Sequence, residues 1–382
     1  MITIANADKA LKTYYLDAIS AQLDSISPFY AAIDKHSAEV YGKEVKVAVV
    51  KGDNSRVVAG AEDGDLPAAG QNRYINLTST LKNIYGTIDI SDKALRAAKN
   101  SEGAFVDLVN AEMEGLISSA KVNFSRMLYG DGTGFLCNFT SVTDGKLGVS
   151  GTNNLIEGMM VDVYTTSAGV DKLSDKIIAI DRVNNKVTLQ TNPTVTTGYL
   201  YNQGSRNKEL TGLKAIFSSS GDLYGIPRSS IPSLVPRFYS NVGALSDVTI
   251  QEHIDRVENF SNCKIDFIAL SNEAKYSYLD FLASYKRNVD YMTTDTGFKA
   301  ISFGGVPMVF ERFVDSGEMY MMDTSTLKLH QLCDWRFLET ENGNILHQAQ
   351  DKPVYSATLV KYCDLICNKP NSLVRLMGIT RE

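Results

Sequence analysis

The sequence predicts an α+β protein that carries a small inserted β-barrel, and three observations support this prediction. Residues 102–129 show a long amphipathic helical pattern. Two extended stretches, 43–50 and 72–90, enclose a loop that has no periodicity. Residues 138–205 alternate strand and turn signals without a helical period. The chain therefore places its longest helix, its longest strands and a compact β-rich unit in separate regions.

The composition is that of a globular protein. Of the 382 residues 44% are apolar, which is enough to bury more than one core. The 38 basic and 44 acidic residues leave a net charge of −6. This charge argues against a protein that grips nucleic acid through a basic face, but not against one that encloses DNA without gripping it. The five cysteines are an odd number, which predicts reduced, mostly buried thiols and folding in a reducing cytoplasm.

No apolar run of about 18 residues is present, so we expect no transmembrane helix. The first residues also lack the pattern of a signal peptide.

The first 90 residues are expected to form extended arms rather than part of a core. Residues 6–34 are expected to be helical, because apolar residues recur at three- and four-residue steps until Pro28 interrupts them. The strands at 43–50 and 72–90, with a loop rich in Gly, Ala and Asp between them, predict a projecting β-arm. An isolated two-stranded hairpin is marginal in water, so this arm should pack on a partner. A short helix over 92–99, capped by Ser91, should follow.

The helix at 102–129 is the strongest secondary-structure prediction. At 1.5 Å per residue it spans roughly 40 Å, which suits a spine across an elongated molecule. Gly130 should end it. Its apolar stripe consists of Phe105, Val109, Met113, Leu116, Ile117, Ala120, Phe124 and Leu128.

The remainder of the chain alternates helices and strands. Residues 138–205 predict a small β-barrel or sandwich inserted into the host fold. A hairpin-like stretch is expected from Trp335 to His347. Helices are expected at 249–260 and 271–284, and strands at 264–270, 306–310, 319–322, 354–364 and 372–379.

No motif with catalytic or ligand chemistry stands out. The four histidines have no metal-ligand spacing, and Cys363 and Cys367 read better as adjacent core thiols than as a metal pair. The run 131–134, Asp-Gly-Thr-Gly, follows a helix, so its helix-end carbonyls would repel phosphate and it reads as a terminating turn. The acidic loop 61–65 lacks the ligand set of a strong calcium loop and reads as a solvated tip. We therefore expect no catalytic, cofactor-binding or metal-binding residue.

The order of these elements resembles that of one family. The stretches that carry the resemblance are 129–134 (Tyr-Gly-Asp-Gly-Thr-Gly), 207–217, 302–309 and 355–365. The sequence resembles the tailed-bacteriophage major capsid protein of the Hong Kong 97 type, with a β-rich insertion domain. The resemblance implies a capsid fold with an N-arm, an extended loop, a spine helix, and peripheral and axial domains, over nearly the whole chain.

The resemblance also implies a domain map. The N-terminal arm would be 1–38 and the extended loop 39–90. The β insertion domain would be 138–205 and the axial domain 241–351. The peripheral domain would comprise 91–137 with the spine helix, 206–240, and the return strands of 352–382.

The implied function is structural rather than enzymatic. The chain would assemble with itself as pentamers and hexamers into an icosahedral shell around packaged double-stranded DNA. Its other partners would be a separate scaffolding protein, a portal and a decoration protein, with only non-specific contact to DNA and none to a membrane. It would lie in the virion capsid, and in the host cytoplasm during assembly. The expected inter-subunit contact residues are Tyr14, Tyr15, Lys46, Lys51, Arg56, Leu66 and Tyr74.

Two departures from the family pattern lead to further expectations. The extended loop begins about 40 residues from Met1, so a long scaffolding region is missing and we expect no maturation cleavage. Lys46 and Lys51, with Asn368 and Asn371, are of the types that some members join covalently, but nothing sets their geometry and no crosslink is expected.

Two alternatives remain open at this point. An encapsulin-like nanocompartment shell that holds an enzyme cargo would use the same fold, although the insertion at 138–205 argues against it. An enzyme with a β-accessory domain is the third interpretation, and it lacks a recognisable nucleophile, metal or cofactor motif.

Overall fold

The computed structural model describes residues 27–381 with several gaps. The description leaves out 53–56, 61, 64, 66–68, 94–101, 167–171, 192–194, 285–290, 294–298, 340–342 and 349–351, and the side chains of 102–111, 172 and 299. Most of the N-arm prediction and of the short helix predicted at 92–99 lies outside the described residues.

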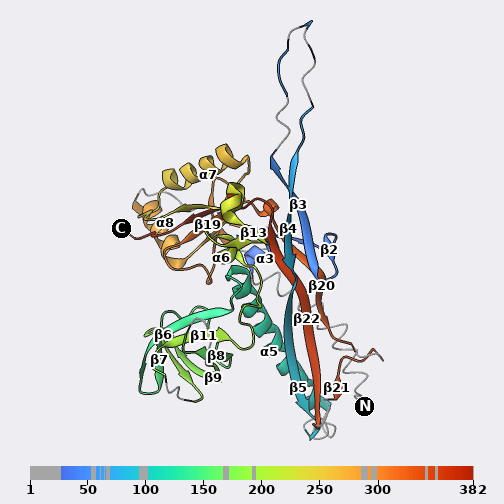
Figure 1. Ribbon diagram of the computed structural model, residues 1–382. Helices are drawn as coiled ribbons and strands as arrows, with labels where there is room; N and C mark the ends of the chain where they lie inside the picture. The colour runs from blue at the N-terminus through green and yellow to red at the C-terminus, as the bar shows by residue number, and fades with distance from the viewer. Residues whose placement is uncertain are drawn as a thin grey trace.

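A long antiparallel sheet covered by one helix runs through the molecule (Figure 1). Its central strand, β22, pairs with β5 over ten residues, from Val354↔Ser91 to Cys363↔Lys82. β20 and β21 pair with the opposite edge of β22, and β1 adds to β20 in parallel. The strands are β1 (Asp34–His36), β5 (Lys82–Ser91), β20 (Leu327–Phe337), β21 (His347–Gln348) and β22 (Val354–Cys367).

The spine helix α5 (Glu102–Tyr129) has the predicted bounds and covers one face of this sheet. Met113, Ile117, Phe124 and Leu128 of its apolar stripe are buried in the core that also contains the sheet residues. The packing is close at Gly86, where an added Cβ would lie 2.8 Å from Leu116 Cδ1. The predicted spine is therefore confirmed.

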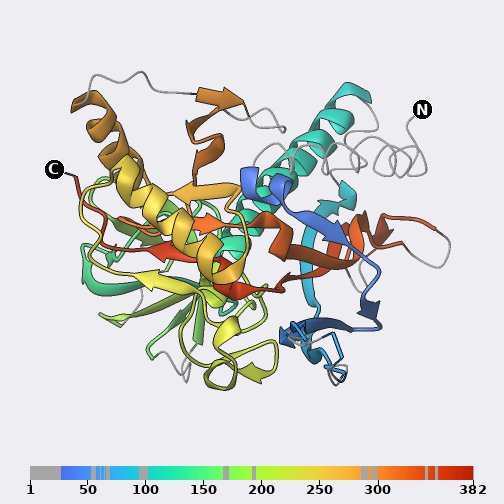
Figure 2. The same ribbon diagram turned by 90° about the horizontal axis from the view of Figure 1, so that it is seen from above.

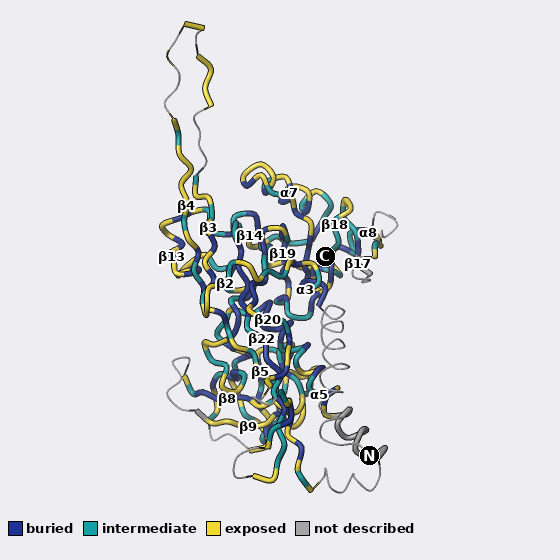
Figure 3. Tube along the Cα trace, turned by 90° about the vertical axis from the view of Figure 1, so that its right-hand side faces the viewer, coloured by how far each residue is buried: buried dark blue, intermediate teal, exposed yellow. Residues whose placement is uncertain are grey.

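The extended loop forms a ribbon that projects from the body (Figure 1). It consists of β2 (Val40–Tyr41), β3 (Glu44–Gly52) and β4 (Arg73–Thr80), paired in the order β2-β3-β4. Only Leu81 separates β4 from β5, so one chain segment passes from the ribbon into the long sheet. The outer part of the ribbon is exposed, whereas its base is partly buried (Figure 3).

A second sheet with two helices on one face forms a separate part of the body. Side chains alternate along β15: Ile268 and Leu270 join the core under the helices, and Phe267 and Ala269 join the core of the spine. α7 crosses in front of the strands in the view from above (gold in Figure 2). The helices are α7 (Asp247–Ser261) and α8 (Asn272–Ser284), and the strands, in sheet order, are β14 (Arg237–Tyr239), β23 (Val374–Leu376), β19 (Met319–Met322), β15 (Phe267–Leu270), β18 (Val306–Phe310), β17 (Lys299–Phe303) and β16 (Tyr291–Thr293).

These two sheets share strands across the expected domain boundaries. β20 lies in the range expected for the axial domain, but it pairs with β22 of the long sheet. β23 lies in the range expected for the peripheral return strands, but it pairs with β14 and β19 of the second sheet. The division into peripheral and axial domains stays a prediction. The remaining short elements are α6 (Leu213–Ile216), β12 (Asp222–Leu223), β13 (Ile226–Pro227), η2 (Arg228–Ser230), η3 (Pro232–Leu234), η4 (Thr324–Thr326) and η5 (Pro370–Ser372).

The β-rich segment closes into a barrel, as predicted. Its order is β10-β7-β6-β11-β8-β9, and closure leaves no free strand edge. Leu147, Val161 and Leu200 are among the residues of its own separate core. The barrel begins earlier than residue 138, because β6 starts directly after the turn at Gly134. Its strands are β6 (Phe135–Thr143), β7 (Lys146–Val149), β8 (Met160–Tyr164), β9 (Lys172–Asp181), β10 (Lys186–Leu189) and β11 (Gly198–Asn202).

The described part of the N-terminal segment begins with the short helix α3 (Pro28–Ala32). Ser27 caps it by accepting a hydrogen bond from the Tyr30 N–H, and Pro28 occupies the first helical position. The predicted helix to residue 34 is wrong at its end, because Ile33 is extended and β1 follows. The segment pairs in parallel with the edge of β20 through β1, so that His36 lies opposite His330.

The two segments that connect the barrel to the body run side by side. The Asn202 N–H donates to the Gly134 carbonyl over 3.0 Å, and the Asn207 N–H donates to the Thr133 carbonyl over 2.9 Å. Gly134 has a φ of 75°, and an added Cβ would lie 2.9 Å from the Ser205 carbonyl. Glycine is therefore required where the connections touch, and the barrel enters and leaves the body at one point.

Replacing residues 135–201 by two glycines is expected to leave the body folded, because the barrel has its own core and its two ends already touch. We expect the free energy of unfolding of the body to fall by about 1–3 kcal/mol for each charged hydrogen bond that is lost, and the described residues show two: from Arg312 to the Leu155 carbonyl and from the Gly204 N–H to the Asp162 carboxylate. Circular dichroism melts of the shortened and full chains would measure this change. A shortened chain that is insoluble or lacks a cooperative transition would show that the barrel supports the spine.

Candidate assembly surfaces

The ribbon exposes apolar side chains that a single copy of the chain leaves in water. Val57 is 94% exposed, Val58 60%, Tyr74 62% and Val50 43%. A two-stranded ribbon has little buried surface to stabilise it, so such side chains point to packing against another molecule.

The structure describes three of the seven predicted contact residues, and all three lie exposed on the ribbon. Tyr74 of β4 stands opposite Val50, so it lies at the same level as Lys51. Lys46 lies nearer the body, opposite Thr78, and its Nζ is 3.5 Å from the Glu44 carboxylate. The other four, Tyr14, Tyr15, Arg56 and Leu66, lie outside the described residues. The contact role of all seven stays a prediction.

A buried lysine ties the N-terminal segment to the spine. Lys361 of β22 is fully buried and donates hydrogen bonds to Gln331 Oε1 over 2.7 Å and to Asp334 Oδ1 over 2.5 Å. The rings of Tyr30, Phe124 and Trp335 lie with their centroids 5.7–5.9 Å from its Nζ. These groups replace the water that a buried ammonium loses.

The Lys361 ammonium also changes the pKa of Asp334, to which it donates a hydrogen bond. Burial by itself raises the pKa of Asp334, but the charge and the hydrogen bond of Lys361 outweigh burial and lower that pKa.

A buried carboxyl group lies at a second junction of the N-terminal segment. Glu311 follows β18, and its N–H donates to the Leu270 carbonyl over 3.0 Å. Its side chain is 7% exposed, close to the Tyr129 hydroxyl at the end of α5 and to the Phe29 N–H of α3. Burial raises the pKa of Glu311 to about 8, and the neighbouring donors oppose this shift. The group is therefore largely a neutral acid at pH 7.

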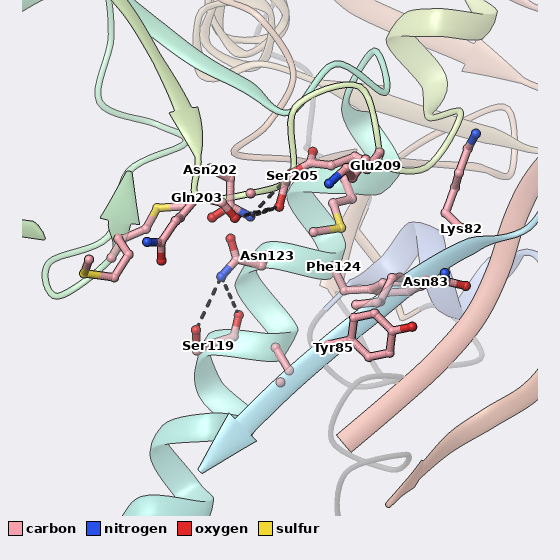
Figure 4. Close-up of a pocket in the computed structure, with 18 of the residues that line it drawn as sticks. Lys82, Asn83, Tyr85, Ser119, Asn123, Phe124, Asn202, Gln203, Ser205 and Glu209 are labelled. Carbon is pink, nitrogen blue, oxygen red and sulfur yellow. Dashed lines mark hydrogen bonds between the residues drawn. The ribbon is translucent and has the colours of Figure 1, made fainter. Parts of the chain in front are cut away.

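A cleft of about 870 Å³ lies between α5, β5 and the barrel (Figure 4). Side-chain amides from all three elements line it: Asn83 from β5, Asn123 from α5 and Asn202 from β11 of the barrel. Two of its amides are held by nearby oxygens: Asn123 Nδ2 donates to the Ser119 carbonyl over 3.1 Å, and Asn202 Nδ2 donates to Ser205 Oγ over 3.1 Å. Glu209 at its edge pairs with Arg126, so its carboxylate is engaged.

The described residues show no constellation for metal or redox chemistry. No group of three or more His, Cys, Asp or Glu side chains in the described part could hold a metal ion. Cys363 and Cys367 are free thiols, and burial raises the pKa of each to about 12. The turn at Asp131 stabilises itself, because Asp131 Oδ1 accepts from the Thr133 N–H over 2.9 Å. In the part of the chain that the structure describes, no helix is long and apolar enough to cross a membrane.

Sequence reasoning missed Lys361, Glu311 and the Arg126–Glu209 pair. Lys361 directly follows the apolar pair 359–360, and Arg126 directly precedes the apolar run 127–129. A charged residue next to such a stretch is a signal of a buried partner.

Comparisons with known proteins support the predicted fold. No protein-family profile and no curated protein sequence matches this chain. A chain of the cyanophage A-1(L) capsid matches with a TM-score of 0.56 over 93% of both chains, at 12% identity. The holo-SrpI encapsulin complex of Synechococcus elongatus PCC 7942 matches with a TM-score of 0.51 over 100% of this chain and 96% of its own, also at 12% identity. The chain therefore has the Hong Kong 97-type capsid fold, as predicted.

Proposed function

We propose that this chain, which has the fold of phage capsid subunits, is the major capsid protein of a tailed bacteriophage. It forms pentamers and hexamers that close into an icosahedral shell around packaged double-stranded DNA. The observation that carries the proposal is the projecting ribbon, whose apolar side chains at Val57, Val58 and Tyr74 need a neighbour to cover them. Contacts that are not self-complementary form closed rings when the rotation between neighbouring copies closes, and capsomers are rings of this kind.

The finer parts of the proposal follow from this function. A separate scaffolding protein would direct closure, and a portal and a decoration protein would complete the particle. The net charge of −6 suits a wall that confines DNA through non-specific contact only. The subunit would act in the virion capsid after assembly in the host cytoplasm. The barrel would be an insertion domain, and the ribbon, the spine and the second sheet would serve as extended loop, peripheral domain and axial domain.

A nanocompartment shell is the second candidate, and one observation favours it: the encapsulin match covers the whole chain. The contents of native particles separate the two candidates. Nuclease-resistant double-stranded DNA supports the capsid, and a protein cargo without DNA supports the compartment.

Replacing Val57 and Tyr74 together by serine is expected to raise the subunit concentration needed for assembly by more than about tenfold. Each buried apolar side chain contributes about 1.5–3 kcal/mol to a contact, and about 1.4 kcal/mol corresponds to a tenfold change. Shell formation would be followed by light scattering and negative-stain imaging in the presence of the scaffolding protein.

The matched control is Val183→Ser with Tyr276→Ser, which removes side chains that are 89% exposed on the barrel and 46% exposed on α8. This control should assemble like the unchanged chain. Equal assembly of both variants would contradict the role of the ribbon, and an unchanged chain that stays monomeric with its scaffold would contradict the capsid function itself.

A further inference from the structure

The root of the ribbon is the point where the chain passes from β4 of the ribbon into β5 of the long sheet. Main-chain pairing between β5 and β22 ends at Lys82↔Cys363. The next residue toward the ribbon, Leu81, does not pair with β22. Its N–H donates instead to the Lys43 carbonyl within the ribbon. The next residue of β22, Asp364, is fully buried and accepts a hydrogen bond at Oδ2 from the Ser79 hydroxyl of β4. The Asp364 side chain thus continues the link to the ribbon after the main-chain ladder has stopped.

The same carboxylate is held from the body. Thr211 donates its N–H to Asp364 Oδ1 over 2.7 Å and its hydroxyl to Oδ2 over 3.1 Å. Burial raises the pKa of Asp364, and the donors from Ser79 and Thr211 oppose this shift. A buried carboxylate depends on every donor that it has, so each of these hydrogen bonds is costly to lose.

A second contact holds the neighbouring residue of β4. The Thr78 N–H donates to the Tyr224 carbonyl over 3.1 Å. The Tyr224 hydroxyl donates to the Leu365 carbonyl and accepts from the Cys367 N–H, each over 3.0 Å. At the ribbon root, Ser79 is therefore bound to β22 and Thr78 to the loop that carries Tyr224, and this loop is itself bound to β22.

We propose that Asp364 and Ser79 form a lock that sets the angle at which the ribbon leaves the body. The angle of the ribbon decides which surface of a second copy of this chain it reaches. Ser79 helps to set this angle and is therefore a positioning residue. This last consequence rests on the proposed function, whereas the lock itself is a property of one subunit.

The length of the ribbon makes the angle at its root important. From Ser79 to Arg73 the strand β4 extends roughly 20 Å, so a tilt of about 20° at Ser79 moves Arg73 by roughly 7 Å, and any part of the ribbon beyond it by more. A shift of this size is larger than the spacing between two strands, about 4.8 Å, and would place the tip on a different part of its neighbour.

The test measures the angle directly in three variants. Spin labels are placed at Tyr74→Cys and Val248→Cys, which replace side chains that are 62% and 76% exposed. The partly exposed thiols are removed by Cys263→Ser and Cys333→Ser. Dilution with excess unlabelled chain confines the electron–electron distance measurement to pairs within one subunit. The variants are Ser79→Ala, Ser79→Thr and Thr211→Val.

We expect a single narrow distance for the unchanged chain and for Ser79→Thr, which keeps the hydroxyl. Ser79→Ala should raise the population of other distances about tenfold and lower the melting temperature by no more than Thr211→Val does, because each variant removes one hydroxyl donor from Asp364. Thr211→Val should lower the melting temperature but keep the narrow distance, because the Ser79–Asp364 hydrogen bond remains.

Two results would overturn the lock: an unchanged narrow distance in Ser79→Ala, or equal broadening in Thr211→Val, which would indicate a general loss of packing. Assembly is scored separately on unlabelled chains. Failure of the unchanged chain to assemble with its scaffold would remove the proposed function, and the distances would still decide whether Ser79 holds the ribbon.

Discussion

Replacing Glu209 by alanine is expected to lower the free energy of unfolding by about 3–5 kcal/mol, because it leaves a buried charge without its partner. The Glu209 and Arg126 side chains are 3% and 4% exposed. Arg126 Nη2 lies 2.5 Å from Glu209 Oε1, and Nη1 lies 2.9 Å from Oε2. Urea unfolding followed by circular dichroism would give the difference in free energy.

The double variant Arg126→Met with Glu209→Leu is the control. Removing both charges leaves no unpaired ion in the core, so this variant should recover most of the stability that Glu209→Ala loses. If Glu209→Ala costs less than about 1 kcal/mol, the guanidinium is solvated and the pair is not an element of the core.

Between pH 6.5 and 8 the protein is expected to become less stable as the pH rises, and Glu311→Gln should remove most of this trend. The pKa of Glu311 is raised from 4.5 to about 8 by burial, so the folded chain holds a proton that the unfolded chain has released. This stabilising contribution is complete below pH 4.5 and is lost as the pH rises through about 8. Over the stated window the loss amounts to about 1.5–2 kcal/mol.

The window separates Glu311 from the shifted histidine and thiol groups, and the comparison with Glu311→Gln separates it from the other carboxyl groups. Burial lowers the pKa of His330 from 6.5 to about 4, so His330 costs stability only as the pH falls below 6.5. Burial raises the pKa of the Cys363 thiol from 9 to about 12, so it acts only at higher pH. Urea unfolding of the unchanged chain and of Glu311→Gln at pH 6.5 and 8 would measure the slopes. Parallel slopes would show that Glu311 is ionised in the folded chain.

The sequence predicted those elements whose residues repeat with the period of the element. The helix over 102–129 has the predicted bounds because its apolar residues recur at helical spacing, and the strand over 306–310 has them because it is a short apolar run that follows a glycine turn. The hairpin expected from Trp335 to His347 is wrong: Trp335 lies within β20, and β21 pairs with β22. Periodicity describes one strand and carries no information about which distant strand will pair with it.

The same limit applies to the candidate surfaces. Lys46, Lys51 and Tyr74 could be placed on the arm, because the arm is recognisable from its flanking strands and its glycine-rich loop. The contacts of Asp364 with Ser79 and Thr211 could not be predicted, because they join residues 285 and 153 positions apart. Such contacts follow from the packing of the whole chain rather than from any local pattern.

The pairing of β5 with β22 has a consequence for how the subunit is made. Thr87 and Asp89 bond Thr358 and Ser356, residues 271 and 267 positions later in the chain. A ladder with such separation forms slowly, and during synthesis it must wait until nearly the whole chain has left the ribosome. The anchoring of the ribbon at Ser79 waits as well, since Asp364 follows in the same late strand. A chain that ends before β22 thus lacks the strand that holds the ribbon at its root.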